Sequence, residues 1–207
     1  MDDILKINKA TYDSLASEYE RKVSKRRDFN ESVISNFVPY ISTGKKVLDI
    51  GCAVGLDTAV FVEKGFVVTG IELSVEMADY ARKRNPSSNI IVGDFMNISF
   101  DEKFDAIFAQ AYIHLYPKNE SNDVLLKMKN LLTIDGVAHI TTSKSMISNE
   151  GWFAKNDYTG NHKRFRKHWT KNELESSLLS VGFSIINYYE IMDPYCKTWM
   201  VFTAKNG

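Results

Sequence analysis

The chain has 207 residues, with 26 Lys and Arg balanced by 26 Asp and Glu. This length favours a single domain, and 44% hydrophobic with 25% charged residues is typical of a globular protein. Zero net charge argues against a broad surface that coats nucleic acid. No apolar run is long enough to span a bilayer and no secretory signal is recognisable, so we expect a cytoplasmic protein.

Residues 1–42 are predicted to be helical. Tyr12, Leu15, Tyr19 and Val23 are spaced three and four apart, which places them on one apolar stripe of a helix. A second helical pattern follows, and Pro39 helps to end it.

From residue 47 onward, short apolar runs alternate with helical stretches. This alternation predicts a parallel sheet with helices on both faces. The ending differs, because two predicted strands, 183–189 and 198–204, have no helix between them. A short connection pairs strands antiparallel, so one reversed strand is expected near the sheet edge. The segment 142–170 is predicted to be a long irregular lid or binding loop.

A glycine turn follows the first predicted strand, in the sequence Asp49-Ile-Gly51-Cys52-Ala53-Val-Gly55. Gly51 lets the backbone approach a ligand closely, and the N–H groups of the helix start favour carboxylates or phosphates. Turns of this kind serve nicotinamide, flavin and sulfonium cofactors alike.

Three acidic residues distinguish among these cofactors. Asp49 stands where a nicotinamide fingerprint has an apolar residue, and a carboxylate there suits a cofactor with a positive amino group. Glu72 lies 21 residues after Gly51, a distance at which an acidic side chain can accept both ribose hydroxyls. Asp94 can accept from an adenine amino group, while Phe95 and Met77 supply apolar contacts to the ring.

In this order the motifs resemble the class I S-adenosylmethionine-dependent methyltransferases, over residues 44–142 and in the antiparallel ending. The resemblance implies a Rossmann-like three-layer α/β sandwich whose seven-stranded, mostly parallel sheet has an antiparallel last strand. One domain is expected, with an N-terminal helical cap (1–42), a cofactor-binding core (44–142), a substrate lid (143–170) and a C-terminal helix with antiparallel strands (171–207). One departure is Ala53, which replaces the middle glycine of the family and can weaken cofactor binding.

The resemblance also implies the cofactor, S-adenosyl-L-methionine, and the product, S-adenosyl-L-homocysteine. Asp49 would hold the amino group, Glu72 the ribose, and Asp94 with Phe95 the adenine. Cys52 is interpreted as a small buried side chain in the turn rather than a nucleophile. The predicted cofactor site consists of Asp49, Gly51, Cys52, Ala53, Gly55, Glu72, Leu73, Met77, Asp94, Phe95, Gln110 and Tyr19.

The stretch Gln110–His114 follows the fourth predicted strand, a position that faces the transferred methyl in this family. His114 is the candidate general base because the usual pKa of histidine is near 6.5; the alternative is a structural histidine. Tyr12 and Tyr112 are the other candidate catalytic residues, and Tyr12 has an equal claim as a packing residue. No histidine pair has metal-ligand spacing, so no metal is expected.

The segment 152–169 interleaves aromatic and basic residues. Between residues 155 and 171, six Lys and Arg face a single acidic residue, Asp157. Arginine binds carboxylate or phosphate in a two-pronged way, so this segment predicts an acidic substrate. The alternative is a solvated basic loop with core aromatics. The predicted substrate residues are Trp152, Arg164, Arg166 and Trp169, while Thr170 and Glu173 form a capping-box pattern.

We therefore expect a methyltransferase that acts on a small, acidic molecule, on oxygen, by in-line displacement. Alternatives are an RNA (tRNA)-modifying methyltransferase, a cofactor-binding domain without catalysis, and a nicotinamide-dependent oxidoreductase. Asp49 and the reversed strand disfavour the last of these. Nucleic-acid and membrane partners are not expected, and the sequence leaves the oligomeric state open.

Overall fold

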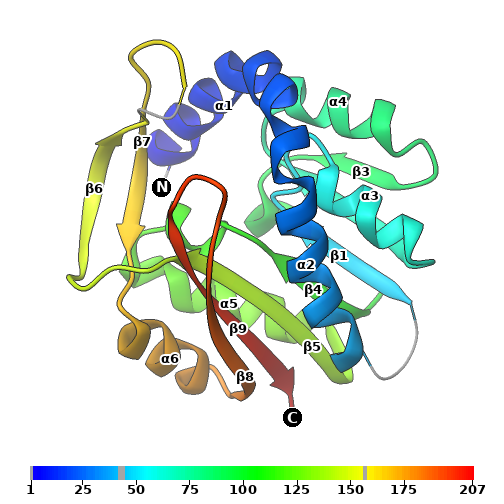
Figure 1. Cartoon of the computed structure of the whole chain (residues 1–207). Coiled ribbons are helices and arrows are strands. Elements are labelled where there is room, and N and C mark those ends of the chain that lie inside the picture. Colours follow the sequence, from blue (N-terminus) through cyan, green and yellow to red (C-terminus); the bar gives the residue numbers. More distant parts are fainter. Residues whose placement is uncertain (1, 42–44, 156–157) are drawn as a thin grey trace.

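The computed structural model describes residues 2–41, 45–155 and 158–207. Figure 1 shows a central sheet with helices on both sides and a separate hairpin at one edge of the molecule. The helices are α1 (Asp2–Val23), α2 (Arg27–Phe37), α3 (Leu56–Glu63), α4 (Val75–Arg84), α5 (Lys118–Leu131) and α6 (Lys171–Ser180). The strands are β1 (Lys46–Ile50), β2 (Val67–Glu72), β3 (Asn89–Val92), β4 (Phe104–Ala109), β5 (Leu132–Ser143), β6 (Asn149–Ala154), β7 (Lys163–His168), β8 (Phe183–Met192) and β9 (Thr198–Asn206).

The main sheet has seven strands in the order β3-β2-β1-β4-β5-β9-β8. Strands β1 to β5 run parallel, and β9 runs antiparallel to both β5 and β8. The connection between β8 and β9 spans residues 193–197, too short for a crossover helix, so the two strands form a hairpin. The predicted fold class is confirmed, and the reversed strand lies one place from the sheet edge.

Two apolar layers hold the helices against the sheet. On one face, Val33 and Phe37 of α2 and Phe61 of α3 pack on strand residues such as Phe108. On the other face, α5 and α6 bury Leu125, Met128, Leu174 and Leu178 in a second cluster, which also contains the strand residues Leu48, Ile107 and Phe202. Because both faces of the central strands are covered, their sequences are continuous apolar runs rather than alternating ones.

The segment 142–170 is not irregular, so that prediction was wrong. Strands β6 and β7 pair antiparallel in a two-stranded sheet of their own, with Trp152 opposite Phe165 and Phe153 opposite Arg164. The ring of Trp152 packs edge-on against Phe165, with centroids 6.0 Å apart. The sequence of β7 is mostly basic, which concealed its strand character from a pattern based on apolar alternation.

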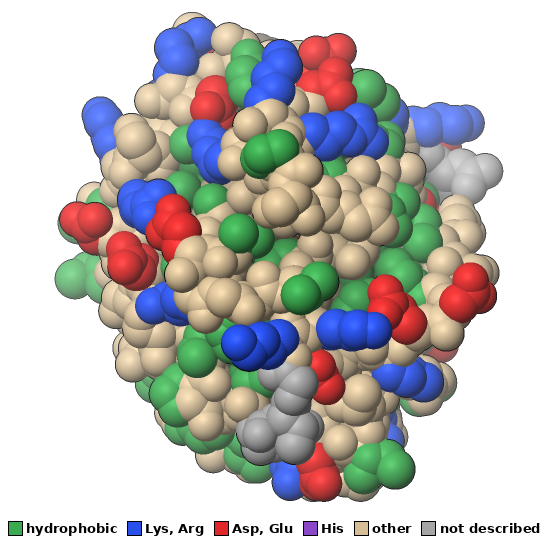
Figure 2. Space-filling view, turned by 90° about the vertical axis from the view of Figure 1, so that its right-hand side faces the viewer, with side chains coloured by type: hydrophobic (Ala, Val, Ile, Leu, Met, Phe, Trp, Pro, Cys, Tyr) green, Lys and Arg blue, Asp and Glu red, His purple; other side chains and the backbone are tan. Residues whose placement is uncertain are grey.

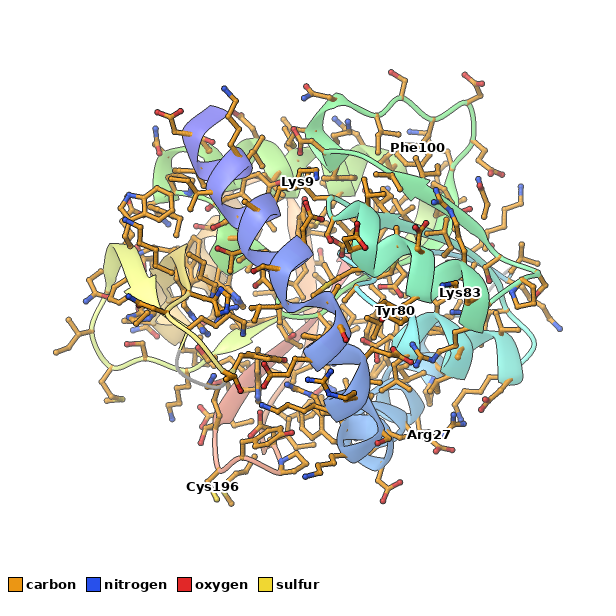
Figure 3. All side chains as sticks on the ribbon, turned by 90° about the horizontal axis from the view of Figure 1, so that it is seen from above. Lys9, Arg27, Tyr80, Lys83, Phe100 and Cys196 are labelled. Carbon is orange, nitrogen blue, oxygen red and sulfur yellow. The ribbon has the colours of Figure 1, made fainter. Side chains whose placement is uncertain are left out.

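Helix α1 lies across the top of the molecule between this hairpin and α4 (Figure 3). On the hairpin side, Thr11 Oγ1 donates a hydrogen bond to the carbonyl of Lys163, and Asn8 Oδ1 accepts one from the N–H of Phe165. On the α4 side, Ser74 Oγ donates to Asp13. The predicted N-terminal helices are confirmed over the described residues, and α1 is positioned as a cap.

Thr170 caps α6, as its sequence pattern predicts, because its hydroxyl accepts from the N–H of Glu173. The carboxylate of Glu173 instead binds Lys167 and Ser148, so the reciprocal half of the capping box is replaced by contacts to β7 and the loop before β6.

Positive and negative side chains are interspersed over the face shown in Figure 2, without a broad area of one sign. Across residues 2–41, 45–155 and 158–207, no helix combines the length and the apolar character that a membrane crossing requires.

Candidate active site

The turn between β1 and α3 follows a left-handed path. Gly51, Ala53 and Gly55 have φ angles of 75°, 49° and 76°. A Cβ on Gly55 would lie 2.5 Å from Asn85 Nδ2 and 2.9 Å from the Cα of Ala81, so a side chain cannot be accommodated there. The close approach of α3 and α4 therefore depends on a glycine at position 55.

Glu72 connects this turn to the next helix. It is 7% exposed, and its two carboxylate oxygens accept hydrogen bonds from the N–H groups of Ala53 at 2.9 Å and Ser74 at 2.8 Å. Burial raises the pKa of Glu72, and these N–H groups partly oppose the shift. Glu72 thus holds the turn and the start of α4 while its carboxylate remains at the cleft wall.

A large cleft opens beside this turn, at the carboxyl ends of the parallel strands. It holds about 1070 Å³ of empty space, including its mouth. The predicted residues that line it are Gly51, Ala53, Glu72, Leu73, Met77, Asp94, Phe95, Gln110, Tyr19, Tyr12, Tyr112, His114 and Arg164. The fold therefore gathers most of the predicted cofactor and catalytic residues around one cavity, as expected for open α/β sheets.

Asp49 does not line the cleft. It is 2% exposed and accepts a hydrogen bond from Thr58 Oγ1 at 2.7 Å. Burial raises its pKa well above the usual range, and the nearby carboxylate of Asp57 adds to the shift. Asp57 itself, whose pKa burial raises to about 6, lines a smaller adjoining cavity with Arg26. This second cavity meets the cleft at the glycine turn, and it is lined by Asp57, whereas Asp49 lines neither cavity.

Cys52 also lines the smaller cavity. It is 5% exposed, and burial raises the pKa of its thiol well above the usual range. These properties fit the interpretation of Cys52 as a small buried side chain. Gly55 contacts α4 and lines neither cavity.

Three of the four predicted substrate residues lie outside the cleft. Trp169 is fully buried in the core, and Trp152 is 42% exposed on the hairpin. Arg166 is buried and donates to Ser143 Oγ. Arg164 alone of the four lines the cleft, where it donates to the Tyr12 hydroxyl at 2.6 Å. Asp157, the acidic residue counted in this segment, lies outside the described residues.

Several cleft residues were not predicted from the sequence. Arg26 lies 3.7 Å from the Asp193 carboxylate, and Asp193 also accepts from the indole N–H of Trp199 at 2.9 Å. The turn 193–197 thereby fixes Lys197 and Trp199, which both line the cleft. In the sequence, Asp193-Pro194 marks the connection between β8 and β9. It does not show that this connection lies at the cleft. The residues missed include Leu5, Asn8, Arg26, Tyr116, Lys155, Tyr158, Lys197 and Trp199.

His114 lies at the cleft with 2% of its surface exposed. Its Nδ1 is 3.2 Å from Thr142 Oγ1. Burial lowers its pKa well below the usual range, and the nearby charges of Arg166 and Arg164 lower it further. The imidazole is therefore neutral at pH 7, the state that a general base requires.

Tyr112 belongs to a hydrogen-bonded chain on the other side of the cleft. Its hydroxyl bonds that of Tyr116, which donates to Asp94 at 3.3 Å. Burial raises the pKa of Tyr112, so this hydroxyl is protonated at pH 7. Among the described residues, no group of three or more His, Cys, Asp or Glu side chains could hold a metal ion.

Comparison with known proteins agrees with this geometry. Residues 47–136 match a family model described as a methyltransferase domain. These residues, fewer than half of the chain, thus resemble a methyltransferase domain. The DhpI-SAH complex matches over 100% of this chain and 98% of that chain at a TM-score of 0.79, with 16% identity. The magnesium protoporphyrin IX methyltransferase ChlM from Synechocystis, solved with bound SAH, matches over 98% of this chain and 99% of that chain at a TM-score of 0.76, with 15% identity.

The matches in amino-acid sequence cover a smaller share of each chain than the structural matches do. The ubiquinone biosynthesis O-methyltransferase of Glaesserella parasuis is 35% identical over 48% of this chain and 45% of that protein. The magnesium-protoporphyrin O-methyltransferase of Rhodobacter capsulatus is 27% identical over 57% of this chain and 54% of that protein. The chain thus spans about half the length of these two methyltransferases. The match to a methyltransferase domain agrees with the predicted family, and ChlM, which shares the fold, was solved with bound SAH.

The residues present fit such a cofactor. Gly51 leaves the turn without a side chain where it faces the cleft. A Cβ at this position would lie 2.8 Å from the Tyr112 ring, so glycine is required there. Glu72 and Asp94 place carboxylate oxygens on the same cavity as the apolar side chains of Met77 and Phe95. This combination suits a ligand with hydroxyl and amino donors on a flat ring system.

Proposed function

We propose that the chain is an active S-adenosylmethionine-dependent methyltransferase that acts on a small, acidic molecule, on oxygen. The bound cofactor would supply an electrophilic methyl group on a positively charged sulfur. The observation that carries the proposal is one cleft that is lined by both carboxylates and cations. Glu72 ends β2 and Asp94 follows β3, whereas Arg164 lies in the hairpin and Lys197 directly precedes β9.

In this proposal each group of residues has a separate task. Glu72 and Asp94 would bind the ribose and adenine, with Met77 and Phe95 packed on the ring. Arg26 and Asp57 would face the charged ends of the methionine portion, where the second cavity joins the cleft. His114 would accept a proton from the acceptor, and α1 with the hairpin β6–β7 would form the lid that orients it and excludes water.

The acidic acceptor is supported by the cations of the cleft. Arg164 belongs to the hairpin, and Lys155 follows its first strand, so the hairpin contributes to the predicted lid. Oxygen as the methylated atom is supported by the two O-methyltransferases among the sequence relatives. Small molecules are favoured over RNA because the charges of the chain balance, whereas RNA binding depends on a basic surface.

The test is a calorimetric titration of the purified chain with S-adenosylhomocysteine, with NADH in a parallel run. We expect micromolar binding of the first and none of the second. Glu72→Gln should weaken S-adenosylhomocysteine by ~10-fold or more, because an ionised acceptor of hydrogen bonds is lost. Glu76→Gln is the matched control on the exposed start of α4. Binding of NADH alone would refute the proposal, as would a failure to find turnover in a screen of acidic acceptors.

A further inference from the structure

The smaller cavity shares part of its wall with the cleft. Asn30 of α2 and Asp57 of α3 line the smaller cavity, and these two helices lie side by side on one face of the sheet (Figure 1). The residues that line both spaces are Tyr19, Arg26, Gly51, Ala53, Gln110 and Ala111. The smaller cavity is therefore an extension of the cleft toward α2 and α3.

Asn30 brings an unused hydrogen-bond acceptor to this cavity. The side chain is 5% exposed, and its Nδ2 donates to Asp57 Oδ1 at 2.6 Å. This bond fixes the orientation of the amide, because only its nitrogen can donate to a carboxylate. The amide oxygen, Oδ1, is buried and has no hydrogen-bond partner among the described residues. Buried polar atoms are nearly always paired in folded proteins, so an atom of this kind suits a ligand that donates.

Gln110 brings a second unused acceptor. It directly follows β4 and lines both the cleft and the smaller cavity. Its Oε1 is buried, again with no partner within residues 2–41, 45–155 and 158–207. Two amide oxygens from separate elements of the fold thus face one cavity without donors.

Asp57 adds a negative charge beside these two oxygens. Burial raises its pKa to about 6, so the carboxylate is ionised at pH 8. Arg26 is the cation among the described residues that line the cavity, and its charge opposes part of this shift. Arg26 also lies 3.7 Å from the Asp193 carboxylate. The cavity therefore combines acceptors from α2, α3 and the end of β4, and this combination suits a positively charged donor.

We propose that Asn30 and Gln110, together with Asp57, hold the ammonium group of the cofactor and select a cofactor that carries one. This inference rests on the proposed function and assigns the residues that recognise one end of the methionine portion. An alkylammonium carries three N–H donors and no acceptor, so it can satisfy both amide oxygens and the carboxylate at once. A carboxylate would place further acceptors against them, and a hydroxyl supplies a single donor.

The experiment compares S-adenosylhomocysteine with its deamino analogue, in which hydrogen replaces the α-amino group. Both are titrated calorimetrically into the purified chain at pH 8. We expect S-adenosylhomocysteine to bind ~10-fold or more tightly, because charge-assisted hydrogen bonds are lost in the analogue. The readout is the ratio of the two dissociation constants, in which the contributions of the adenosine and the carboxylate cancel.

Two variants assign this preference to the amide oxygens. Asn30→Leu and Gln110→Met keep the approximate size of each side chain and remove its oxygen. Each should lower the ratio several-fold by weakening S-adenosylhomocysteine, while the affinity for the deamino analogue stays nearly unchanged. Gln110→Met leaves the bond between Asn30 and Asp57 intact, so its effect cannot come from a disturbed Asp57. Asn36→Leu is the matched control, because Asn36 lies on α2 but is exposed and lines neither cavity.

The outcomes separate this inference from the proposed function. Retained binding of the deamino analogue shows that each variant is folded. Equal affinity of the unmodified chain for both compounds would overturn the inference alone, as would a full preference kept by both variants. If neither compound binds the unmodified chain, the proposed function fails and the inference fails with it.

Discussion

Two alanines next to the cleft have left-handed backbone conformations. Ala53 has a φ of 49° and Ala111 a φ of 58°. Such conformations cost residues other than glycine about 1–2 kcal/mol each. Each alanine donates its N–H to a fixed acceptor, Ala53 to Glu72 and Ala111 to Thr141 Oγ1. The turn therefore forms with alanine at the position where the family has its middle glycine, at the cost of local backbone strain.

His114 is the residue on which the proposed proton transfer depends. His114→Gln should lower turnover by ~10²-fold if His114 is the base, while S-adenosylhomocysteine affinity stays nearly unchanged. A base acts in its neutral form, and burial lowers the pKa of His114 well below 6.5. The turnover number of the unmodified chain should therefore stay flat as pH falls from 8 through 6.5, and drop only at lower pH.

Steady-state rates at several pH values test both parts of this prediction. Full activity of His114→Gln would assign the histidine a structural role. A rate that halves near pH 6.5 would show that the titrating group is not the buried imidazole.

At the scale of elements, α1 and the hairpin β6–β7 pack together along a polar seam. Asn8 is 3% exposed and accepts from the backbone of Phe165, and Glu18 accepts from the N–H and hydroxyl of Thr159. The rings of Tyr19 and Tyr158 stack with centroids 5.8 Å apart. The hairpin has only two strands and is not part of the main sheet, so it depends on this seam for its position.

Asn8→Ala should loosen the hairpin β6–β7 without disturbing the main sheet. The change removes the acceptor for the Phe165 N–H and leaves a buried donor without its partner, which costs about 1–3 kcal/mol. Amide exchange should accelerate in 163–168 and remain unchanged in β1, β4 and β5. Lys9→Ala is the control, because Lys9 pairs with Asp13 within α1. Equal exchange in both variants would show that the hairpin holds its position without the seam.

The pattern of apolar residues predicted the strands of the main sheet well and those of the hairpin β6–β7 poorly. Apolar runs such as 47–50 and 106–109 are buried on both faces, so their sequence shows a strand directly. Arg166 and Lys167 are buried too, although their charges suggested a loop or a binding surface. The partners that permit this burial, such as Ser143, Ser148 and Glu173, come from other segments. Tertiary pairing of this kind cannot be read from local pattern.

The same limit applies to the candidate site. Residues next to strand ends, such as Glu72 and Asp94, were predictable because parallel strands bring their carboxyl ends to one edge. Lys197 reaches the cleft from the turn between β8 and β9, and Arg26 from the short turn between α1 and α2, where no motif marks them. Trp169 shows the opposite case, since an aromatic residue near basic ones proved to be core.

Across the whole molecule, buried titratable groups shift the dependence of stability on pH in opposite directions. Burial raises the pKa of Asp57 to about 6. Its contribution to the free energy of unfolding is therefore greatest below the usual carboxyl pKa near 3.8 and is lost as pH rises through 6. Burial lowers the pKa of His139 to about 3. Its contribution to the free energy of unfolding is therefore complete above pH 6.5 and is lost as pH falls toward 3.

His139 gives the clearest test of this balance. It lies in the apolar layer beneath α2, stacked on Phe108 with centroids 4.3 Å apart, and neither ring nitrogen has a hydrogen-bond partner among the described residues. Charging this ring in the folded state is unfavourable, so between pH 8 and pH 5 it should cost the fold about 2 kcal/mol. His139→Leu, of similar volume, removes the titrating group and the two unpaired nitrogens.

Urea unfolding of the two proteins at pH 8 and pH 5 measures the effect. The variant should be at least as stable at pH 8, because it removes buried polar atoms without partners. Its advantage should grow by about 2 kcal/mol at pH 5, since only the unmodified chain must then keep a histidine neutral below its unfolded pKa of about 6.5. Asp57 cannot produce this difference, because it titrates in both proteins alike. An advantage independent of pH would mean that His139 is protonated equally in the folded and unfolded chains.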